Sequence, residues 1–373
     1  MEEKRKMKSL QKKDFGMTSK GAQATLYILK NEAGMQISVS DFGATLTSVL
    51  VPDKDNNPVE VTLGYDDAAG YEAGLGNAFG ASVGRNANRI GGAVIEINGT
   101  EYHLTKNDGE NNLHSGLDFY HGRMWKVADA DDTHVTFEMD SPDGDQGYPG
   151  ALVMKVTYSL DEENTLMIHY EAEPDQDTII NMTNHSYFNL NGHKSGDVLN
   201  HTLWLNADAF TPADAASIPT GEIRSVEGTP MDFRTDKTIG KDIEADYEPL
   251  VFGKGYDHNW VLKNEGKFDK VAEVAGDESG IHMSVLTDLP GVQIYTANFL
   301  DGVKGRDGAV YEMRDAICLE TQYYPDAIHH ENFPEMCIRD RYSRELDQTI
   351  VECCDRLHIQ VVCWLIKKQY ICS

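Results

Sequence analysis

The sequence predicts an all-β protein, built as one large antiparallel sandwich or barrel-like body. Apolar and polar residues alternate along many short segments, which is the period of a strand. Turn-forming pairs separate these segments, and the 33 glycines fit a turn-rich, many-stranded fold. Amphipathic helical patterns are nearly absent before residue 336, and no fixed-period repeat or low-complexity linker divides the body.

The strand-like segments follow one another along the body. The clearest alternating runs cover residues 35–39, 95–97, 102–104, 152–160, 166–172, 282–285 and 292–295. Asn98-Gly99 separates the second run from the third, and this pair is the strongest short hairpin signal because both turn residues take positive φ. The polar residues 161–164 form a connection of hairpin length between the fourth and fifth runs. Pro290-Gly291 separates the last two.

The last 37 residues differ in composition from the body. They hold five of the six cysteines, and they carry six basic and five acidic residues, against 27 and 56 in the first 336. Apolar residues recur in the tail every three or four positions, which is helical periodicity, at Leu346, Ile350, Cys354, Leu357, Val361 and Leu365. We therefore predict one sandwich domain over residues 1–336. The cysteine-rich tail over residues 337–373 is expected to be helical or disordered and to fit poorly as a last strand.

Charge and composition exclude several classes of protein. The net charge of −28 disfavours contact with phosphate backbones and with anionic membranes. A single cysteine in the first 336 residues excludes a disulfide framework there. Residues 1–13 are charged and lack the apolar core of a signal peptide, and no apolar run approaches the roughly 20 residues of a membrane helix. We expect a cytoplasmic protein without nucleic-acid or membrane partners.

Four polar segments interrupt the strand pattern and are candidates for chemistry. They are residues 84–90 with 111–116, 181–190, 255–260 and 318–327. Together they supply histidines, a glutamate, an aspartate, an arginine and several amides. Such side chains suit a polyhydroxylated ligand, because sugar hydroxyls both donate and accept hydrogen bonds. No nucleophile elbow, P-loop or dinucleotide fingerprint is present, and His329-His330-Glu331 lacks a further ligand at metal-binding spacing.

Each candidate also has a structural interpretation. An Arg/Asn cluster such as residues 85–89 is more often a solvated loop, and a lone histidine such as His185 is more often a satisfied structural residue. Glu320 is less ordinary, since it follows the apolar residues 317–319 on a predicted strand. A buried carboxylate needs a partner or a function. Cys318 is expected to be a small apolar packing residue.

Six motifs match a known family in order and spacing. They are GRNANRI at 84–90, NNLHSG at 111–116, NMTNHSYFNLNG at 181–192, YDHNW at 256–260, GVQIYTAN at 291–298 and LETQYYPDA at 319–327. The chain resembles the aldose 1-epimerases, also called galactose mutarotases, from about residue 15 to Pro334. The resemblance implies a large antiparallel β-supersandwich, in agreement with the period-two pattern. It also implies an isomerase that interconverts the α and β anomers of free aldohexoses such as glucose or galactose, without a metal or other cofactor.

The resemblance also implies roles for individual residues. Glu320 would be the general base and His185 the general acid. The residues that would contact the sugar are Asn88, Arg89, His114, Asp257 and Gln293. Opening the hemiacetal ring requires one group to take the anomeric hydroxyl proton while another protonates the ring oxygen. Glutamate and histidine can do this near neutral pH if burial raises the glutamate pKa and the histidine starts protonated.

Other readings remain open from the sequence. A non-catalytic sugar-binding module on the same scaffold would not require the His185–Glu320 pair. A hexose-phosphate epimerase would want additional basic residues at the pocket rim, and a glycoside hydrolase would want paired carboxylates. Arg85 and His258 lie beside motif positions and are expected to be structural. The expected partner is a small sugar, bound by a monomer or weak homodimer.

The family pattern ends near Pro334, where charge, cysteine usage and periodicity change together. We therefore hypothesise that residues from about 336 are foreign to the family, as after a frameshift or a chimeric assembly. The expected catalytic residues all precede this point.

Overall fold

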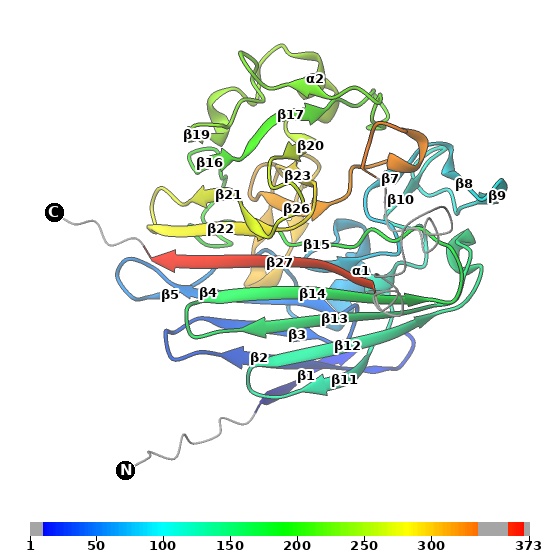
Figure 1. The fold of residues 1–373 in the computed structure, drawn as a ribbon. Coiled ribbons are helices and arrows are strands. Elements are labelled where there is room, and N and C mark those ends of the chain that lie inside the picture. Colours follow the sequence, from blue (N-terminus) through cyan, green and yellow to red (C-terminus); the bar gives the residue numbers. More distant parts are fainter. Residues whose placement is uncertain (1–9, 335–356, 369–373) are drawn as a thin grey trace, which may run out of the picture.

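A computed structural model of the chain describes residues 10–334 and 357–368 (Figure 1). Within them the regular structure is mostly strand, with a few short helices. The two α-helices of this part are short, α1 (Ala68–Ala73) and α2 (Glu248–Gly253). The all-β prediction is confirmed.

The N-terminal residues form a five-stranded antiparallel sheet in the order β1-β2-β3-β4-β5. Its strands are β1 (Gln11–Met17), β2 (Gln23–Lys30), β3 (Gln36–Ser40), β4 (Thr45–Pro52) and β5 (Pro58–Glu60). Tyr27 on β2 meets Phe137 of the next sheet edge to face, with 5.6 Å between ring centroids. Aromatic pairs of this geometry join the two sheets through their buried faces.

A nine-stranded sheet runs across the molecule in the order β11-β12-β13-β14-β27-β22-β21-β16-β19 (Figure 1). Its strands are β11 (Lys126–Ala130), β12 (His134–Ser141), β13 (Leu152–Leu160), β14 (Thr165–Pro174), β16 (Thr202–Leu205), β19 (Lys237–Thr238), β21 (Asp269–Ala275), β22 (Ile281–Thr287) and β27 (Leu357–Lys368). Along β13 every second residue is buried, and β13 and β14 form the predicted hairpin across residues 161–164. One face of this sheet therefore packs on the core while the other faces outward.

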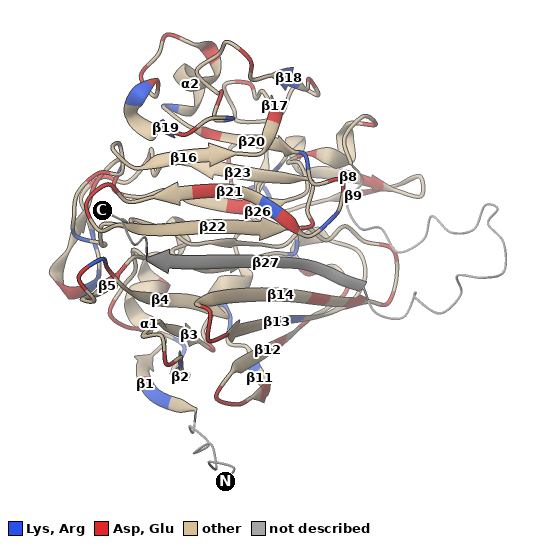
Figure 2. Cartoon of the chain, turned by 60° about the vertical axis from the view of Figure 1, so that its left-hand side comes forward, with Lys and Arg blue, Asp and Glu red and all other residues tan. Residues whose placement is uncertain are grey.

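Strand β27 corrects the prediction for the tail. It lies between β14 and β22 and pairs antiparallel with both (Figure 1). Figure 2 shows the flanking strands β14 and β22 from another side. The helix predicted from the spacing of Leu357, Val361 and Leu365 is therefore wrong for residues 357–368, which form a strand of the sandwich. A short apolar run cannot be assigned to helix or strand by periodicity alone, and here the two flanking strands decide. Residues 337–356 lie outside the described residues, so the boundary at 336 stays a prediction.

A second five-stranded sheet has the order β18-β17-β20-β23-β26. Its strands are β17 (Ala207–Thr211), β18 (Arg224–Ser225), β20 (Asp257–Leu262), β23 (Gly291–Tyr295) and β26 (Cys318–Gln322). All residues of β23 and β26 are buried, so these strands are covered on both faces. The connection at Pro290-Gly291 crosses between sheets, since β22 belongs to the nine-stranded sheet and β23 to this one.

Four two-stranded pairs complete the described strands. They are β6 (Ala81–Val83) with β15 (Thr183–His185), β7 (Arg89–Ile90) with β10 (Asn112–Leu113), β8 (Val94–Ile97) with β9 (Thr100–His103), and β24 (Val303–Lys304) with β25 (Val310–Tyr311). The predicted Asn98-Gly99 hairpin is confirmed, with φ of 53° and 75° at the two turn residues.

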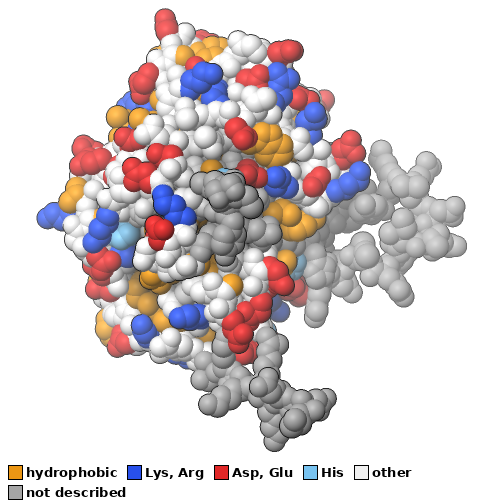
Figure 3. Space-filling view, turned by 90° about the vertical axis from the view of Figure 1, so that its left-hand side faces the viewer, with side chains coloured by type: hydrophobic (Ala, Val, Ile, Leu, Met, Phe, Trp, Pro, Cys, Tyr) orange, Lys and Arg blue, Asp and Glu red, His pale blue; other side chains and the backbone are white. Residues whose placement is uncertain are grey.

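The main hydrophobic core joins all three large sheets. It includes Val39 of β3, Val156 of β13, Val285 of β22 and Trp260 of β20, none of which is exposed. Fully enclosed apolar side chains of this kind supply most of the stabilisation of a fold. On the face in Figure 3, acidic, basic and hydrophobic side chains are interspersed. In the part of the chain that the structure describes, no helix is both long enough and apolar enough to cross a bilayer.

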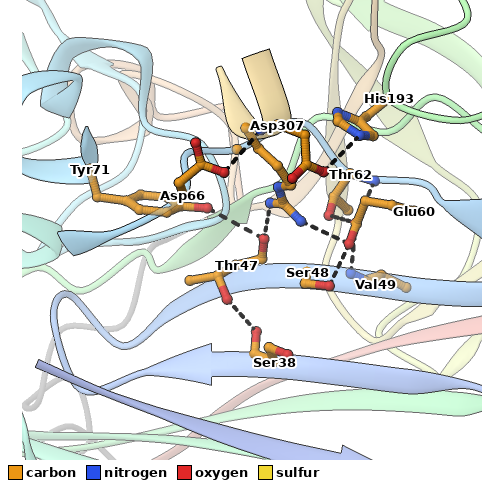
Figure 4. Close-up of polar contacts among 12 residues, drawn as sticks. Ser38, Thr47, Ser48, Val49, Glu60, Thr62, Asp66, Tyr71, His193 and Asp307 are labelled. Carbon is orange, nitrogen blue, oxygen red and sulfur yellow. Dashed lines mark hydrogen bonds and ion pairs between the residues drawn. The ribbon is translucent and has the colours of Figure 1, made fainter. Parts of the chain in front are cut away.

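A half-buried ion pair fixes the segment that joins β23 to β26. Arg306 Nη1 lies 2.8 Å from Glu60 Oε2, and the Arg306 amide donates to Gly64 O at 2.7 Å. Glu60 also accepts hydrogen bonds from Thr62 Oγ1 at 2.6 Å and from Val49 N at 3.0 Å (Figure 4). Removing either partner would leave the other charge poorly solvated, so the ion pair holds the β24–β25 pair against β4 and β5.

Candidate active site

Three adjacent strands of the second five-stranded sheet place polar side chains on one face. Asn259, Gln293 and Glu320 lie directly opposite one another on β20, β23 and β26. Because side chains two residues apart share a face, Asp257 and Cys318 project on the same side. The polar motifs, separated by up to 63 residues in the sequence, therefore meet in a single layer.

Asp257 and Glu320 of this layer line a cavity of about 170 Å³. The cavity is lined by Gly76, Asn77, Ala78, Arg89, Leu113, His114, His185, Tyr187, Asp257, Tyr295, Phe299, Leu300 and Glu320. Five of the seven expected site residues thus surround one small polar and aromatic space. The composition is that of a small-molecule site, in which a few convergent polar groups orient the ligand.

His185 and Glu320 form a close pair in this cavity. His185 Nε2 lies 3.6 Å from Glu320 Oε1, and both side chains are buried. Burial raises the pKa of Glu320 well above its usual value; the Asp257 carboxylate adds to the shift and Arg89 opposes it. Burial also lowers the pKa of His185 to about 4, opposed by a hydrogen bond to its own backbone. The direction expected for Glu320 is confirmed.

The same shifts correct the expected proton distribution. Burial disfavours an imidazolium as well as a carboxylate. In the free protein the proton that the pair shares therefore rests on the carboxyl of Glu320, and His185 does not start protonated. Glu320 Oε2 is fully buried and has no hydrogen-bond partner among the described residues. A buried polar atom without a partner is costly, so a ligand hydroxyl would gain from meeting it.

Asp257 and Arg89 set the electrostatics around the Glu320 carboxyl. Gln293 Nε2 donates to Asp257 Oδ1 at 2.7 Å, and burial raises the pKa of Asp257 despite Arg89 and this hydrogen bond. Arg89 lines the cavity and donates from Nε to Asp108 Oδ2 at 2.7 Å. An arginine between carboxylates keeps its direction, because its planar donors are shared with a fixed partner.

His114 is held in a single tautomer. Its Nδ1 accepts a hydrogen bond from the backbone N–H of Asn88 at 3.1 Å, and the backbone N–H of His114 donates to Asn88 O at 3.0 Å. Burial, with the neighbouring His185 and Arg89, holds the pKa of His114 well below its usual value. The neutral ring therefore carries its proton on Nε2 and can present it to a ligand.

Two expected contact residues lie just behind the cavity. Asn88 and Gln293 are not among the lining residues; Asn88 supports His114 and Gln293 supports Asp257. Arg85 and His258, which we expected to be structural, are buried and do not line the cavity. Arg85 donates to Pro149 O and Ser141 Oγ, both at 2.7 Å.

Aromatic residues that carried no expected role complete the site. The Tyr187 ring is stacked on His185, with 5.1 Å between centroids, and Tyr295 meets His185 edge to face. Phe299 is 55% exposed at the rim. Both tyrosines stand in the motifs, and Tyr187 follows His185 by two residues, so strand alternation was the available signal. Phe299 and residues 76–78 lie outside the predicted strands and gave none.

One group among the described residues has the donor types of a metal site. His185, Cys318 and Glu320 each offer a ligand atom, and these atoms lie within 4.8 Å of one another. The imidazole nitrogens face different partners, however, with Nδ1 toward Cys318 Sγ at 3.6 Å and Nε2 toward Glu320. One nitrogen cannot serve both neighbours, so the geometry fits an acid–base pair better than a coordination sphere. His329 Nδ1 pairs with Asp326 Oδ1 at 2.7 Å.

The fold and the site define a β-sandwich protein with an imidazole–carboxyl pair in a small pocket lined by polar and aromatic side chains. The family profile described as aldose 1-epimerase matches residues 25–347. The chain belongs to the aldose 1-epimerase family.

Known proteins agree with this assignment. The chain is 38% identical to the galactose mutarotase of Homo sapiens, over 92% of this chain and 98% of that protein. It is 37% identical to the aldose 1-epimerase of Escherichia coli (strain K12), over 84% and 90%. The crystal structure of the GalM/aldose epimerase homologue from C. elegans superposes with a TM-score of 0.82 at 29% identity, covering 92% of this chain and 99% of that one. The crystal structure of galactose 1-epimerase from Lactobacillus acidophilus superposes with a TM-score of 0.80 at 26% identity, covering 98% of this chain and 100% of that one.

Proposed function

We propose that this protein is an isomerase that interconverts the α and β anomers of a free aldohexose, with glucose and galactose as the expected substrates. The observation that carries the proposal is the buried Glu320 carboxyl, which lies 3.6 Å from His185 and has one oxygen without a partner in the described residues. The relatives named galactose mutarotase and aldose 1-epimerase support the same activity. Of the alternatives, a plain sugar-binding module leaves this pair without a purpose.

Ring opening needs two proton transfers that balance within the pair. Glu320 takes the proton from the anomeric hydroxyl while His185 gives one to the ring oxygen, and the C1–ring oxygen bond breaks to leave an aldehyde. The aldehyde turns about its C1–C2 bond, and closure on the other face reverses both transfers. The pair holds one shared proton before and after each half-reaction, so no cofactor is consumed.

The reactive form requires that shared proton to move from Glu320 to His185. The two atoms are already 3.6 Å apart, and because burial favours the neutral form of both groups, contacts with the bound sugar must offset part of the cost of charging them. The short separation lets a proton pass between the two groups in either direction, which suits a reaction whose forward and reverse steps exchange acid and base.

The remaining polar groups are assigned to binding. The hydrogen bond from Asn88 N to His114 Nδ1 orients the ring of His114 and its Nε2–H. The hydrogen bond from Gln293 orients Asp257. Arg89 supplies donors from the side of β7. We assign these groups to the hydroxyls and ring oxygen of the sugar, which fixes the anomeric centre against the pair.

Polarimetry on freshly dissolved α-glucose and α-galactose tests the proposal. The folded full-length protein should accelerate the approach to equilibrium rotation over the buffer blank. Equal rates with and without folded protein would overturn it. A phosphorylated hexose in a parallel arm distinguishes the hexose-phosphate alternative, and binding without acceleration would favour the sugar-binding module. The cytoplasmic location, the monomer or weak dimer, and the absence of nucleic-acid and membrane partners stay predictions.

A further inference from the structure

The His185 ring lies between two side chains of one strand. Cys318 and Glu320 are two residues apart on β26, so they share a face. Cys318 Sγ is 3.6 Å from Nδ1 of His185, and Glu320 Oε1 is 3.6 Å from Nε2. Each ring nitrogen therefore has its own neighbour, the thiol at Nδ1 and the carboxyl at Nε2.

We propose that Cys318 is a positioning residue for His185, whose sulfur pairs with Nδ1 so that Nε2 is the nitrogen that exchanges a proton with the sugar. The inference rests on the proposed function. It adds to Cys318 a role beyond apolar packing, although the residue does belong to a buried cluster with Tyr187 and Tyr295.

The two histidines of the site show why the neighbour of Nδ1 matters. For His114 that neighbour is a backbone N–H, which can only donate, so His114 Nδ1 stays unprotonated and Nε2 keeps its proton. A neutral ring locked in this way cannot give up its Nε2 proton without becoming an anion. His185 Nδ1 instead faces sulfur, which has lone pairs that accept, if weakly. His185 can therefore hold a proton on Nδ1 while Nε2 gives one away and takes it back.

A thiol also keeps the proton affinity of the imidazole low. Burial, with Glu320 and Asp257, raises the pKa of the Cys318 thiol well above its usual value, so the sulfur is uncharged. A neutral partner does not stabilise the imidazolium as a carboxylate would. The other titratable groups around the ring are Glu320, His114 and His121, with the phenols of Tyr187 and Tyr295. Of these, Glu320 lies against Nε2, which leaves Nδ1 to Cys318 and to the backbone carbonyl of His185.

Three substitutions separate positioning from packing. Cys318→Ala removes the side-chain partner of Nδ1, Cys318→Ser keeps a small group that can accept, and Cys318→Asp supplies an anion. Val292→Ala is the matched control, because Val292 is equally buried in the main core on the neighbouring strand β23. Unfolding midpoints and circular dichroism report folding for all four.

The kinetic arm measures kcat, KM and the pH profile of mutarotation. Cys318→Ala should lower kcat roughly two- to tenfold with KM unchanged, which is the effect of losing one neutral hydrogen bond. Cys318→Ser should stay within about twofold of the native chain, and Val292→Ala should lose stability without losing kcat. Cys318→Asp should move the acid limb of the profile upward by at least about one pH unit. Unchanged kcat and acid limb in folded Cys318→Ala and Cys318→Asp would overturn the proposal.

A spectroscopic arm keeps the proposal testable without turnover. In protein labelled with ¹⁵N-histidine, the His185 signals are assigned by their loss in His185→Asn. The neutral ring of the native chain should carry its proton on Nδ1, and Cys318→Ala should shift the tautomer balance toward Nε2. An Nε2 proton in the native chain would overturn the inference even if one of the variants failed to fold. Failure of the proposed function shows differently, as absent mutarotation with the native tautomer intact.

Discussion

The nine-stranded sheet and the five-stranded sheet that carries the site bury their strands in different ways. On β13 buried and partly exposed residues alternate, and every buried position is apolar. On β23 and β26 every residue is buried, and Gln293, Glu320 and Gln322 are among them. Burial on both faces without a function favours apolar residues, because unpaired polar groups are costly there. Polar residues on a strand that is covered on both faces therefore indicate a functional site. Alternating burial instead indicates a strand with one face on the core and the other toward solvent.

The largest effect is expected from removing strand β27 from the middle of the nine-stranded sheet. A chain ending at Pro334 lacks the 12-residue strand β27, so β14 and β22 each lose a partner in the middle of the sheet. We expect loss of soluble monomer and aggregation through the open edges, measured by size-exclusion chromatography and thermal unfolding. A chain ending at Lys368 is the matched control. Equal stability of both chains would contradict this expectation and favour a body that is complete at residue 336.

The next effect removes the charge chemistry of the other sheet. Glu320→Gln keeps the shape of the side chain but cannot take a proton, so kcat should fall roughly 10²- to 10⁴-fold with the unfolding midpoint retained. Glu171→Gln makes the same change on β14, away from the cavity, and should leave kcat near native. Near-native mutarotation rates in Glu320→Gln would exclude Glu320 as the base.

A core substitution in the nine-stranded sheet should have the reverse effect, lowering stability while leaving kcat unchanged. Met154 on β13 has no exposed surface, and Met154→Ala should lower the free energy of unfolding by about 2–5 kcal/mol through lost contacts and a cavity. Urea unfolding measures the loss. The kcat of the folded fraction should stay native, so a large fall in kcat would show that the two sheets are less independent than their burial suggests.

A smaller effect is expected behind the cavity. Gln293→Leu removes the hydrogen bond to Asp257, and the loss of about 1–2 kcal/mol should raise KM roughly tenfold with little change in kcat. Gln322 donates to Gln293 Oε1 at 3.3 Å and does not reach Asp257, so Gln322→Leu should change KM less. Initial-rate polarimetry over a range of sugar concentrations separates the two constants. A larger effect from Gln322 would reverse the assigned order of support.

The smallest effect concerns pH within the ordinary range. The active pair holds one shared proton, and activity is lost when a second proton binds or when the first is removed. Because burial lowers the pKa of His185 to about 4, the acid limb of kcat/KM should lie near pH 4 rather than near 6.5. The alkaline limb should lie well above the ordinary range of a carboxyl, since the pKa of Glu320 is raised. An acid limb near pH 6.5 would show that His185 is solvated in solution.

Much of the nine-stranded sheet and part of the site could be predicted from sequence. The β13–β14 hairpin and the Asn98-Gly99 turn followed from local patterns, since alternation and turn chemistry act over a few residues. The expected site residues came from motifs, and the cavity gathers five of them. Cys318 looked like a packing residue because its neighbours in sequence are apolar. Its contact with His185, 133 positions away, has no local signal.

The sequence by itself determined the all-β class, the strand alternation and the side chains capable of acid–base chemistry, because these depend on composition and short-range spacing. Only the tertiary structure decided that β22 and β23 enter different sheets, that residues 357–368 fill the position between β14 and β22, and that His185 meets Cys318 on one nitrogen and Glu320 on the other. It also decided the proton distribution. The pKa of a buried group depends on the solvent it loses and the charges it meets, and both are set by distant segments brought together in the fold.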